Sequence, residues 1–292
     1  MKLSIVTINY NNAEGLRKTL ASVASQTYSN IEHVIVDAAS TDGSVEAIKE
    51  YAEASKHTVI WSSEKDKGIY NGMNKGIKRA TGDYIQILNS GDVLAASDVT
   101  ERMIKTLNSL NVNSLNDKIE IPILYGNMIR DFGNGKLSKD VCLGDRVAKN
   151  QHAQEVEWTM DDFIKGTVNH DPTYIRQSLY EKYGLYDENL KICSDWKWFV
   201  NTVVFGGEKL YYVPIDVTVF DTTGISEKNL EYREKERHKE LEKMLPAAIL
   251  KDYDRYHFPI TQMKRLKKQH LWGFVHFMER VLFKLEKWRV LK

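Results

Sequence analysis

The stretch that decides the fold is residues 64–92, EKDKGIYNGMNKGIKRATGDYIQILNSGD. Apolar residues recur at helical spacing from Ile69 to Ala80 and predict a helix over residues 68–80. Residues 83–89 then form an apolar run that is typical of a buried strand. The run ends in Asn-Ser-Gly-Asp, a short polar stretch with one carboxylate. A helix that leads directly into a buried strand is the repeating unit of a parallel sheet.

The same alternation of strand and helix extends from this stretch back to the N-terminus. One further helix follows the stretch on its C-terminal side. Strands are predicted over residues 3–8, 31–38 and 58–63, and helices over residues 11–26, 41–54 and 98–110. This pattern predicts an α/β fold with a Rossmann-like, mostly parallel sheet and flanking helices. Ligands of such sheets bind outside the carboxyl ends of the strands. The polar residues that follow each strand are therefore the candidates for a site.

The pattern changes in the second part of the chain. Residues 122–141 predict a hairpin with its turn at Asn134-Gly135, followed by a mixed region without clear alternation. Residues 227–245 form a highly charged helix, and residues 271–288 place apolar side chains along one helical face. We expect a domain over 1–226, divided into halves at residue 112, and a helical C-terminal extension over 227–292.

Composition and charge limit the classes of protein. With 42% hydrophobic and 28% charged residues, the 292-residue chain is typical of a globular protein. Cys142 and Cys193 stand far apart and outside any zinc or disulfide pattern, and the N-terminus has no signal-peptide pattern, so we expect a cytoplasmic protein. No run of about 18 apolar residues predicts a membrane-spanning helix. Neither GxGxxG nor GxxxxGK[ST] occurs, which disfavours dinucleotide and P-loop sites.

Four stretches carry polar residues at the predicted strand ends. They are TINYNN (7–12), VDAASTDGS (36–44), SSEKDKGIYNGMN (62–74) and NSGD (89–92). Taken singly, Asn, Asp, Ser and Gly favour turns and helix caps for local reasons. Capping is therefore the first interpretation for Asn12, Asp42 and Asp98.

Taken together, the stretches closely resemble the inverting family 2 glycosyltransferases with a GT-A fold. The resemblance is carried by SIVTINYNNAEGLRKTLASVASQTYSNIEHVIVDAASTDGS, EKDKGIYNGMNKGIKRATGDYIQILNSGD, HDPTYIRQSLYEKYGLYDENLKICSDWKWF and FDTTGIS. They occur in the family's order and cover roughly residues 3 to 226, and the second is the most specific. The region beyond residue 227 lies outside the resemblance.

The resemblance implies a nucleoside-diphosphate sugar donor, usually linked to UDP. Asp37 would accept a hydrogen bond from the imide N–H of uracil, and Thr7 and Asn9 would line the base pocket. Asp66 would lie beside the base or the ribose. Gly68 would allow close backbone approach, since it has no Cβ, and Asn74 would orient that loop.

The resemblance also implies a divalent cation, Mn²⁺ or Mg²⁺, which neutralises charge on the leaving diphosphate. The family generally supplies an acidic cluster at this place. NSGD has Asn89 and Gly91 where acids are frequent, which leaves Asp92 as the expected metal ligand, directly or through water. Asn89 would still hydrogen-bond the ribose.

The second half should supply a general base for the acceptor hydroxyl. The stretch ICSDWKWF matches the family's acid-bearing helix start, so Asp195 is the candidate. The pattern alone fits capping of that helix by Ser194 or Asp195 equally well. His170 reads either as a packed polar residue or, by the resemblance, as a group near the acceptor. The loop 221–226 contains Gly224 as a candidate hinge over the phosphates.

These features predict an enzyme that transfers a hexose or N-acetylhexosamine from a UDP-sugar to a hydroxyl of a glycan or lipid-linked acceptor in bacterial surface polysaccharide synthesis. The alternatives are a non-catalytic nucleotide-binding or scaffold subunit and, more weakly, a nucleotidyltransferase. Residues 255–292 hold ten Lys/Arg and two Asp/Glu, against 31 and 38 in the remainder. This basic tail reads either as a helix packed on the acidic body or as an interfacial helix on anionic lipid at the inner face of the plasma membrane. The acidic body and the lack of a nucleic-acid motif disfavour nucleic-acid binding.

Overall fold

The computed structural model describes residues 1–112, 120–133, 136–140, 153–222, 229–253, 255, 273–274, 277–278 and 280. The chain divides into two compact units, Met1–Glu236 and Arg237–Lys292. The predicted turn at Asn134-Gly135, the Gly224 hinge and most of the predicted amphipathic helix over 271–288 lie outside the described residues. The predicted domain boundary after residue 226 stays a prediction.

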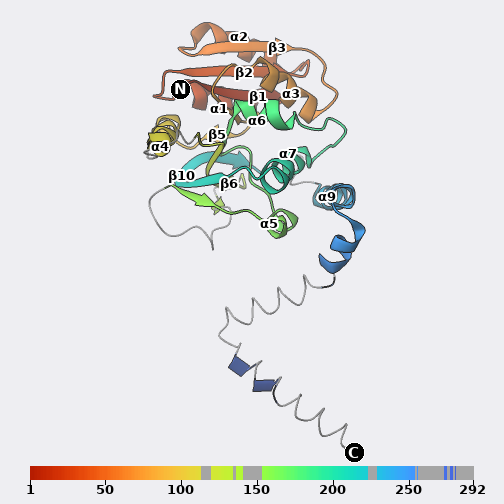
Figure 1. The fold of residues 1–292 in the computed structure, drawn as a ribbon. Coiled ribbons are helices and arrows are strands. Elements are labelled where there is room, and N and C mark those ends of the chain that lie inside the picture. Colours follow the sequence, from red (N-terminus) through yellow and green to blue (C-terminus); the bar gives the residue numbers. More distant parts are fainter. Residues whose placement is uncertain are drawn as a thin grey trace, which may run out of the picture. The chain divides into compact units, whose positions relative to one another are not determined.

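The first part of the chain alternates strand and helix as expected (Figure 1). Its elements are β1 (Leu3–Asn9), α1 (Ala13–Ala24), β2 (Ile31–Asp37), α2 (Ser44–Ala54), β3 (Thr58–Ser63), α3 (Ile69–Arg79), β4 (Tyr84–Ile87), β5 (Val93–Leu94) and α4 (Val99–Val112). β1 pairs in parallel with both β2 and β4, and β2 pairs in parallel with β3. The predicted parallel sheet is confirmed, and only the two-residue β5 was not foreseen.

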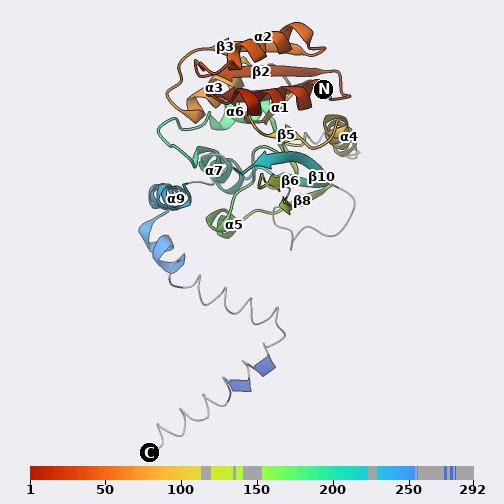
Figure 2. The same ribbon diagram turned by 180° about the vertical axis from the view of Figure 1, so that it is seen from behind.

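The helices cover both faces of this sheet. Leu16 and Leu20 of α1 pack with Ile35 of β2 and Ile48 of α2. Successive residues of a strand point to opposite faces, and Val36 faces Gly76 of α3. Helices α1 and α2 therefore lie on one face and α3 on the other, as the two opposite views show (Figures 1 and 2).

The second part adds further strands to the same sheet. Its elements are β6 (Ile123–Asp131), β7 (Leu137–Asp140), β8 (Gln154–Val156), α5 (Met160–Lys165), β9 (Thr173–Arg176), α6 (Gln177–Tyr183), α7 (Ser194–Phe199), the π-helix η1 (Val200–Phe205) and β10 (Leu210–Asp221). The strand order is β3-β2-β1-β4-β9-β6-β10-β5, with β7 beside β6 and β8 beside β10. β6 and β7 pair antiparallel, which confirms the predicted hairpin. β9 joins the two parts because it pairs antiparallel with both β4 and β6.

An apolar core lies at the junction of the two parts. It combines residues of β1 and β4 with Val99, Met103 and Leu107 of α4 and with Val213 and Val217 of β10. The buried faces of α4 and β10 therefore hold the sheet's second half against its first.

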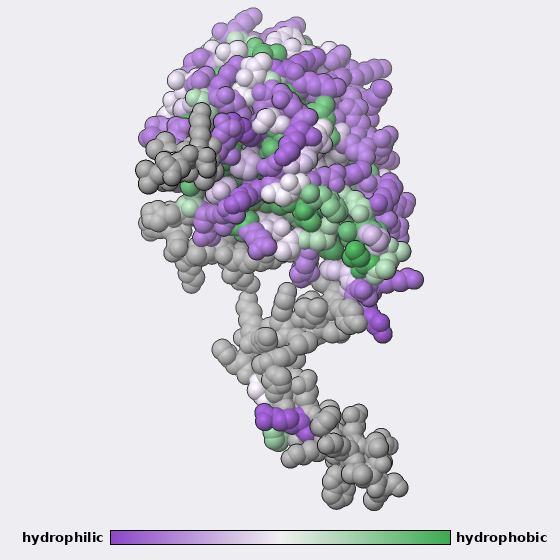
Figure 3. Space-filling model, in the orientation of Figure 1, coloured by the Kyte–Doolittle hydropathy of each residue, from purple (hydrophilic) through white to green (hydrophobic). Residues whose placement is uncertain are grey.

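The charged helix α9 (Leu230–Met244) follows β10, as the sequence predicts. Most of the face seen in Figure 3 is hydrophilic, with apolar side chains gathered at the lower right of the folded part. Leu230 and Tyr232, at the start of α9, are among the exposed large apolar residues. In the part of the chain that the structure describes, no helix is both long and apolar enough to cross a membrane.

Candidate active site

The carboxyl ends of β1, β2 and β4 are joined through Asn9. Its Nδ2 donates to Asp37 Oδ1 at 2.8 Å, and its Oδ1 accepts from Ser90 Oγ at 2.8 Å. The three neighbouring strands end at one edge of the sheet because they run parallel. Residues that the sequence places in three separate stretches thus form one constellation, as predicted.

Asp37 is the centre of this constellation. Its carboxylate accepts from Asn9 Nδ2, from the Ser40 backbone N–H at 2.9 Å, and from the Ser40 and Ser63 hydroxyls at 2.6 Å each. Burial raises the pKa of Asp37, but these hydrogen bonds outweigh it and hold the pKa below its usual value. These hydrogen bonds occupy the acceptor directions of the ionised Asp37 carboxylate. It would accept a hydrogen bond from a nucleotide base N–H only after a serine hydroxyl has turned away.

Thr7 lies beneath the site rather than on its surface. It is fully buried, and its Oγ1 lies 2.9 Å from Nε2 of His33. Burial, with the neighbouring His57, lowers the pKa of His33 to about 3, so the imidazole is neutral. The contact of Thr7 with a core histidine favours a supporting role over direct contact with a nucleotide.

Asp66 and Gly68 precede α3. Lys75 Nζ lies 2.5 Å from Asp66 Oδ1, which fixes the Asp66 carboxylate against the first turns of α3. Gly68 has a φ of 143°, a conformation that L side chains rarely adopt, and the space where its Cβ would lie is open. A ligand therefore has room to approach the backbone at Gly68, as the sequence analysis expected.

Asn74 is placed differently from the expectation. Only 2% of it is exposed. Its Nδ2 donates to Tyr186 O and Glu188 Oε1, both at 2.9 Å, and its Oδ1 accepts from Tyr186 N at 3.0 Å. The amide ties α3 to the segment before α7, so the geometry favours a structural role for Asn74 and not contact with the nucleotide.

The loop Asn89–Asp92 is fastened to α1. Thr19 Oγ1 donates to Asp92 O at 2.7 Å and accepts from Gly91 N at 3.0 Å, while Asn12 Nδ2 donates to Ser90 O at 3.2 Å. Asn12 also caps α1 through Gly15 N, which confirms its predicted capping role. The turn at Ser90-Gly91 is therefore a fixed feature of the sheet edge.

The carboxyl group of Asp92 points into the protein. Asp92 is 3% exposed, and its Oδ1 accepts from the backbone N–H of Asp221 at 2.9 Å. Burial and the negative charge of Asp171 raise the pKa of Asp92 well above its usual value. The carboxyl group faces the protein interior and the Asp221 backbone, and the metal role of Asp92 stays a prediction.

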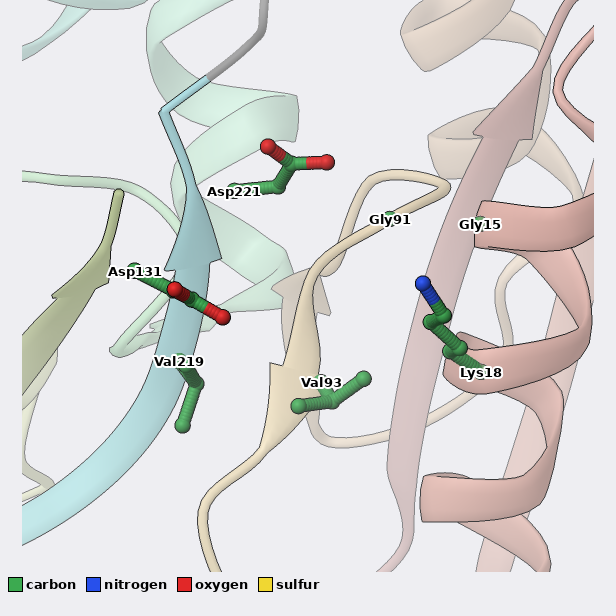
Figure 4. A pocket seen from close by; sticks show the side chains of 7 residues that line it. All are labelled: Gly15, Lys18, Gly91, Val93, Asp131, Val219 and Asp221. Carbon is green, nitrogen blue, oxygen red and sulfur yellow. The ribbon is translucent and has the colours of Figure 1, made fainter. Parts of the chain in front are cut away.

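Two partly exposed acids lie on the other side of the Gly91 turn (Figure 4). A pocket there is lined by Gly15, Lys18, Gly91, Val93, Asp131, Val219 and Asp221. Asp131 and Asp221 come from the ends of β6 and β10, and Lys18 comes from α1. A Cβ at position 91 would lie 3.4 Å from Asp221 Oδ2. The Asp221 carboxylate thus lies beside the place where an acid at position 91 would project.

Asp195 lies in the first turn of α7 and does not cap it. The N-cap is Cys193, without a side-chain capping bond. Tyr70 Oη lies 2.9 Å from Asp195 Oδ1, and His170 Nδ1 lies 3.1 Å from Asp195 Oδ2. These partners come from α3 and from the loop before β9. The side chain keeps 14% of its surface exposed, so a ligand can reach it.

The pKa of Asp195 reflects these partners. Burial raises it, but the hydrogen bond and charge of His170, with the bond from Tyr70, bring it below the usual value. Burial lowers the pKa of His170, but the charge of Asp171 and the hydrogen bond to Asp195 raise it to about 9. At neutral pH the pair is therefore an imidazolium and a carboxylate.

Asn89 contacts the same histidine. Its Nδ2 lies 3.1 Å from His170 Nε2, and its buried Oδ1 meets no hydrogen-bond partner among the described residues. A protonated imidazole donates from both nitrogens. Turning the Asn89 amide by 180° would bring its oxygen toward His170 Nε2–H and give that N–H an acceptor. Asn89 is thus connected to Asp195 through His170, not turned toward a ribose.

Several site residues escaped the sequence analysis. Asp171 lies beside His170 in the chain, with Oδ1 3.4 Å from His170 Nε2. Tyr70 lies two residues after Gly68, in the most specific stretch, and was taken only as part of a helix. Asp131 follows an apolar strand, the same signal that singled out Asp37. Tyr10 is 67% exposed directly after β1, an unusual place for a large aromatic ring.

Solved structures share this fold. Staphylococcus aureus TarS 1-349 in complex with UDP superposes with a TM-score of 0.59 at 17% identity, over 76% of this chain and 60% of that one. A mannosyltransferase, PcManGT from Pyrobaculum calidifontis in complex with GDP-Man and Mn²⁺, gives a TM-score of 0.52 at 17% identity, over 75% of this chain and 56% of that one. The chain thus spans less than two thirds of either structure. The chain therefore has the fold of the GT-A glycosyltransferases.

Residues 4–119 match the family model described as glycosyl transferase family 2. The uncharacterized glycosyltransferase Rv1514c of Mycobacterium tuberculosis is 27% identical over 230 residues, which cover 76% of each chain. A PGL/p-HBAD biosynthesis glycosyltransferase of Mycobacterium bovis is 25% identical over 193 residues, or 66% of each chain. Residues 4–119 are thus similar to glycosyl transferase family 2, and the matched relatives are glycosyltransferases.

The residues present fit a divalent cation only in part. Among the described residues, no group of three or more His, Cys, Asp or Glu side chains has a metal-binding arrangement. Mg²⁺ in phosphate sites commonly uses one or two carboxylates and takes its other ligands from phosphates and water. Asp131 and Asp221 at the pocket supply two such carboxylates, so the donor set suits a cation that binds together with a diphosphate.

Proposed function

We propose that the protein is an inverting transferase that moves a hexose or N-acetylhexosamine from a UDP-sugar to a hydroxyl group of a glycan or lipid-linked acceptor. The observation that carries the proposal is Asp195. It is an ionised, partly exposed carboxylate, and Tyr70 and His170 hold it from two sides. Its position is fixed by groups from helix α3 and from the loop before β9.

Asp195 would act as the general base. In direct displacement the acceptor oxygen attacks the anomeric carbon, the bond from that carbon to the diphosphate oxygen breaks, and the acceptor proton passes to the carboxylate. Tyr70 Oη contacts Asp195 Oδ1 and His170 Nδ1 contacts Asp195 Oδ2, and the exposed part of the carboxylate can accept a hydrogen bond from a sugar hydroxyl. The imidazolium of His170 keeps the carboxylate ionised in a buried surrounding until the proton arrives.

The donor would lie along the edge formed by β1, β2 and the Gly91 turn. Asp37 and Asn9 would recognise the base, and Tyr10 offers an exposed ring beside them. The UDP complex of TarS supports a uridine nucleotide for this fold. Gly68 would admit the ligand close to the backbone.

A divalent cation, when bound, supplies positive charge to the leaving diphosphate. Asp131 and Asp221 would hold the cation. Asp92 would support Asp221 by accepting a hydrogen bond from its backbone N–H. In this arrangement Asp221, at the end of β10, supplies the carboxylate that an acid at position 91 would otherwise supply. The Mn²⁺ complex of PcManGT supports a cation in this fold.

A panel of nucleotide sugars tests the proposal. Wild-type protein is incubated with each UDP-sugar and Mn²⁺, with and without glycan acceptors, and UDP release is measured. We expect acceptor-stimulated release with one or a few UDP-hexoses, and a product with the anomeric configuration opposite to that of the donor. UDP binding without turnover on any acceptor would favour a non-catalytic binding subunit, and pyrophosphate formation from nucleoside triphosphate and sugar phosphate would indicate a nucleotidyltransferase.

A further inference from the structure

Glu236 on α9 binds the backbone just before the base-bearing helix. Its Oε1 accepts from the N–H of Lys191 at 2.8 Å, and its Oε2 accepts from the N–H groups of Ile192 and Cys193 at 2.9 and 3.0 Å. Glu236 is only 8% exposed. One carboxylate therefore satisfies three consecutive backbone donors that would otherwise need partners.

The same short segment is held from its other side by Tyr70. Tyr70 Oη lies 2.6 Å from Ile192 O and 2.9 Å from Asp195 Oδ1. The backbone N–H groups of residues 191–193 thus contact Glu236. The Ile192 carbonyl and the Asp195 carboxylate both contact the phenol of Tyr70. Any shift of this segment moves Cys193, the N-cap of α7, and with it Asp195 two residues later.

A second contact ties α9 to the segment. Lys191 Nζ lies 5.7 Å from the centre of the Tyr232 ring, one turn before Glu236 on α9. The family model covers residues 4–119 and does not reach α9. Both contacts therefore lie outside the region that the family model matches.

We propose that Glu236 is a positioning residue for the general base, which sets the place of Asp195 by fixing the backbone of residues 191–193. The inference rests on the proposed function, because it assumes that Asp195 is the base. It also extends the catalytic unit to residue 236, beyond the predicted domain end at residue 226.

The chemistry of the contact explains why a carboxylate is needed. Burial raises the pKa of Glu236, but the backbone N–H groups of Lys191, Ile192 and Cys193 lower it below its usual value, so the group is ionised. A glutamine has the same shape but only one acceptor oxygen, and its NH₂ group would face backbone donors. An aspartate keeps the charge but is one methylene shorter.

The test compares Glu236→Gln and the milder Glu236→Asp with wild type and with Glu231→Gln, an exposed control on the same helix. Misplacing a catalytic group by about 1 Å costs about 100-fold in rate. We expect kcat to fall about 10- to 100-fold in Glu236→Gln and less in Glu236→Asp, with the KM for the donor within about twofold of wild type. Glu231→Gln should retain wild-type kcat.

Hydrogen exchange provides a second readout that does not depend on turnover. In Glu236→Gln the amides of residues 191–193 should exchange at least about tenfold faster, while the amides of β1 keep wild-type rates. If Glu236→Gln does not fold, the same measurements on Glu236→Asp decide the question. A lower kcat with unchanged exchange at these amides would overturn the positioning role.

The proposal and the proposed function fail in different ways. A normal kcat in Glu236→Gln beside an inactive Asp195→Asn would overturn the positioning role alone. If the wild type shows no turnover with any donor and acceptor, the proposed function is contradicted. The positioning role is then contradicted too, even if the amides of residues 191–193 exchange faster in Glu236→Gln.

Discussion

His170 lies in an environment that the neighbouring residues in the sequence do not indicate. It lies between two acids, with Nδ1 3.1 Å from Asp195 Oδ2 and Nε2 3.4 Å from Asp171 Oδ1. An imidazole in this place stabilises negative charge on both sides when it is protonated. The sequence left open whether His170 packs or acts near the acceptor, and the structure makes it the partner of the candidate base.

The pH dependence of stability should reveal this histidine. Its pKa rises from 6.5 to about 9 on folding, so the bound proton stabilises the folded state. The contribution is fully present below about pH 6.5 and is lost as pH rises through about 9, with a limit of about 3 kcal/mol. In urea unfolding, His170→Gln should therefore differ most from wild type near pH 6 and least near pH 10.

The control for this measurement is His238→Gln on α9, where the histidine side chain is 62% exposed. Its difference from wild type should change little across the same range. A constant difference between His170→Gln and wild type from pH 6 to pH 10 would show that His170 is not protonated in the fold.

Gly91 gives a second prediction at the residue scale. It has a φ of 107°, and a side chain there would meet Asp221 Oδ2 at 3.4 Å. Restoring an acid with Gly91→Asp should therefore lower the unfolding free energy by about 1–3 kcal/mol, through backbone strain and like-charge repulsion. Titration calorimetry should show no gain in Mn²⁺ affinity with UDP present.

Gly91→Asn separates the two causes, because asparagine tolerates positive φ and carries no charge. It should lose less stability than Gly91→Asp. If Gly91→Asp is as stable as wild type and binds Mn²⁺ more tightly, Asp221 does not take the place of the missing acid.

At the scale of the elements, the helix α3 approaches the sheet closely. A Cβ at Gly76 would lie 2.3 Å from Val6 Cγ1. Gly76→Ala should lower the unfolding free energy by about 1–3 kcal/mol, because the helix must move away from β1. Gly166→Ala is the matched control, since its Cβ would come no closer than 3.8 Å to its neighbours. Equal thermal stability of the two variants would contradict this packing.

Strong periodicity explains why the first half was predictable. Apolar runs bounded by Asn, Asp and Gly predicted β1 to β4 and the helices between them, and polar residues at parallel strand ends had to share one edge. The two-residue β5 has no periodic pattern. β9 is recognised as a strand only through its pairing with β4 and β6. Long-range pairing decided those elements.

The site was predictable to a similar extent. The sequence singled out Asn9, Asp37 and Asp195 as candidates because each ends a strand or matches a helix start. Tyr70 and Glu236 act through contacts that span 125 and 43 residues of sequence. Local patterns carry no information about such contacts. The pKa of Asp92 depends likewise on Asp171 and Asp221, which are distant in the chain.

At the scale of the whole molecule, the chain joins an acidic body to a basic tail. The described tail residues Phe274 and Phe277 are 63% and 57% exposed. We propose that the tail binds anionic lipid at the inner face of the plasma membrane, where a lipid-linked acceptor would be found. The full chain should sediment with vesicles that contain phosphatidylglycerol and not with phosphatidylcholine vesicles, and about 0.5 M salt should release it. Equal binding to both vesicle types would contradict the proposal.

The role of Asp195 as the base of a sugar transfer from UDP is tested most directly by the turnover of Asp195→Asn. The variant is given the donor and acceptor that the wild type uses, and its binding of UDP is measured by calorimetry. We expect kcat to fall about 100- to 10,000-fold, with UDP affinity within about threefold of wild type. Retention of wild-type kcat by Asp195→Asn would contradict this role.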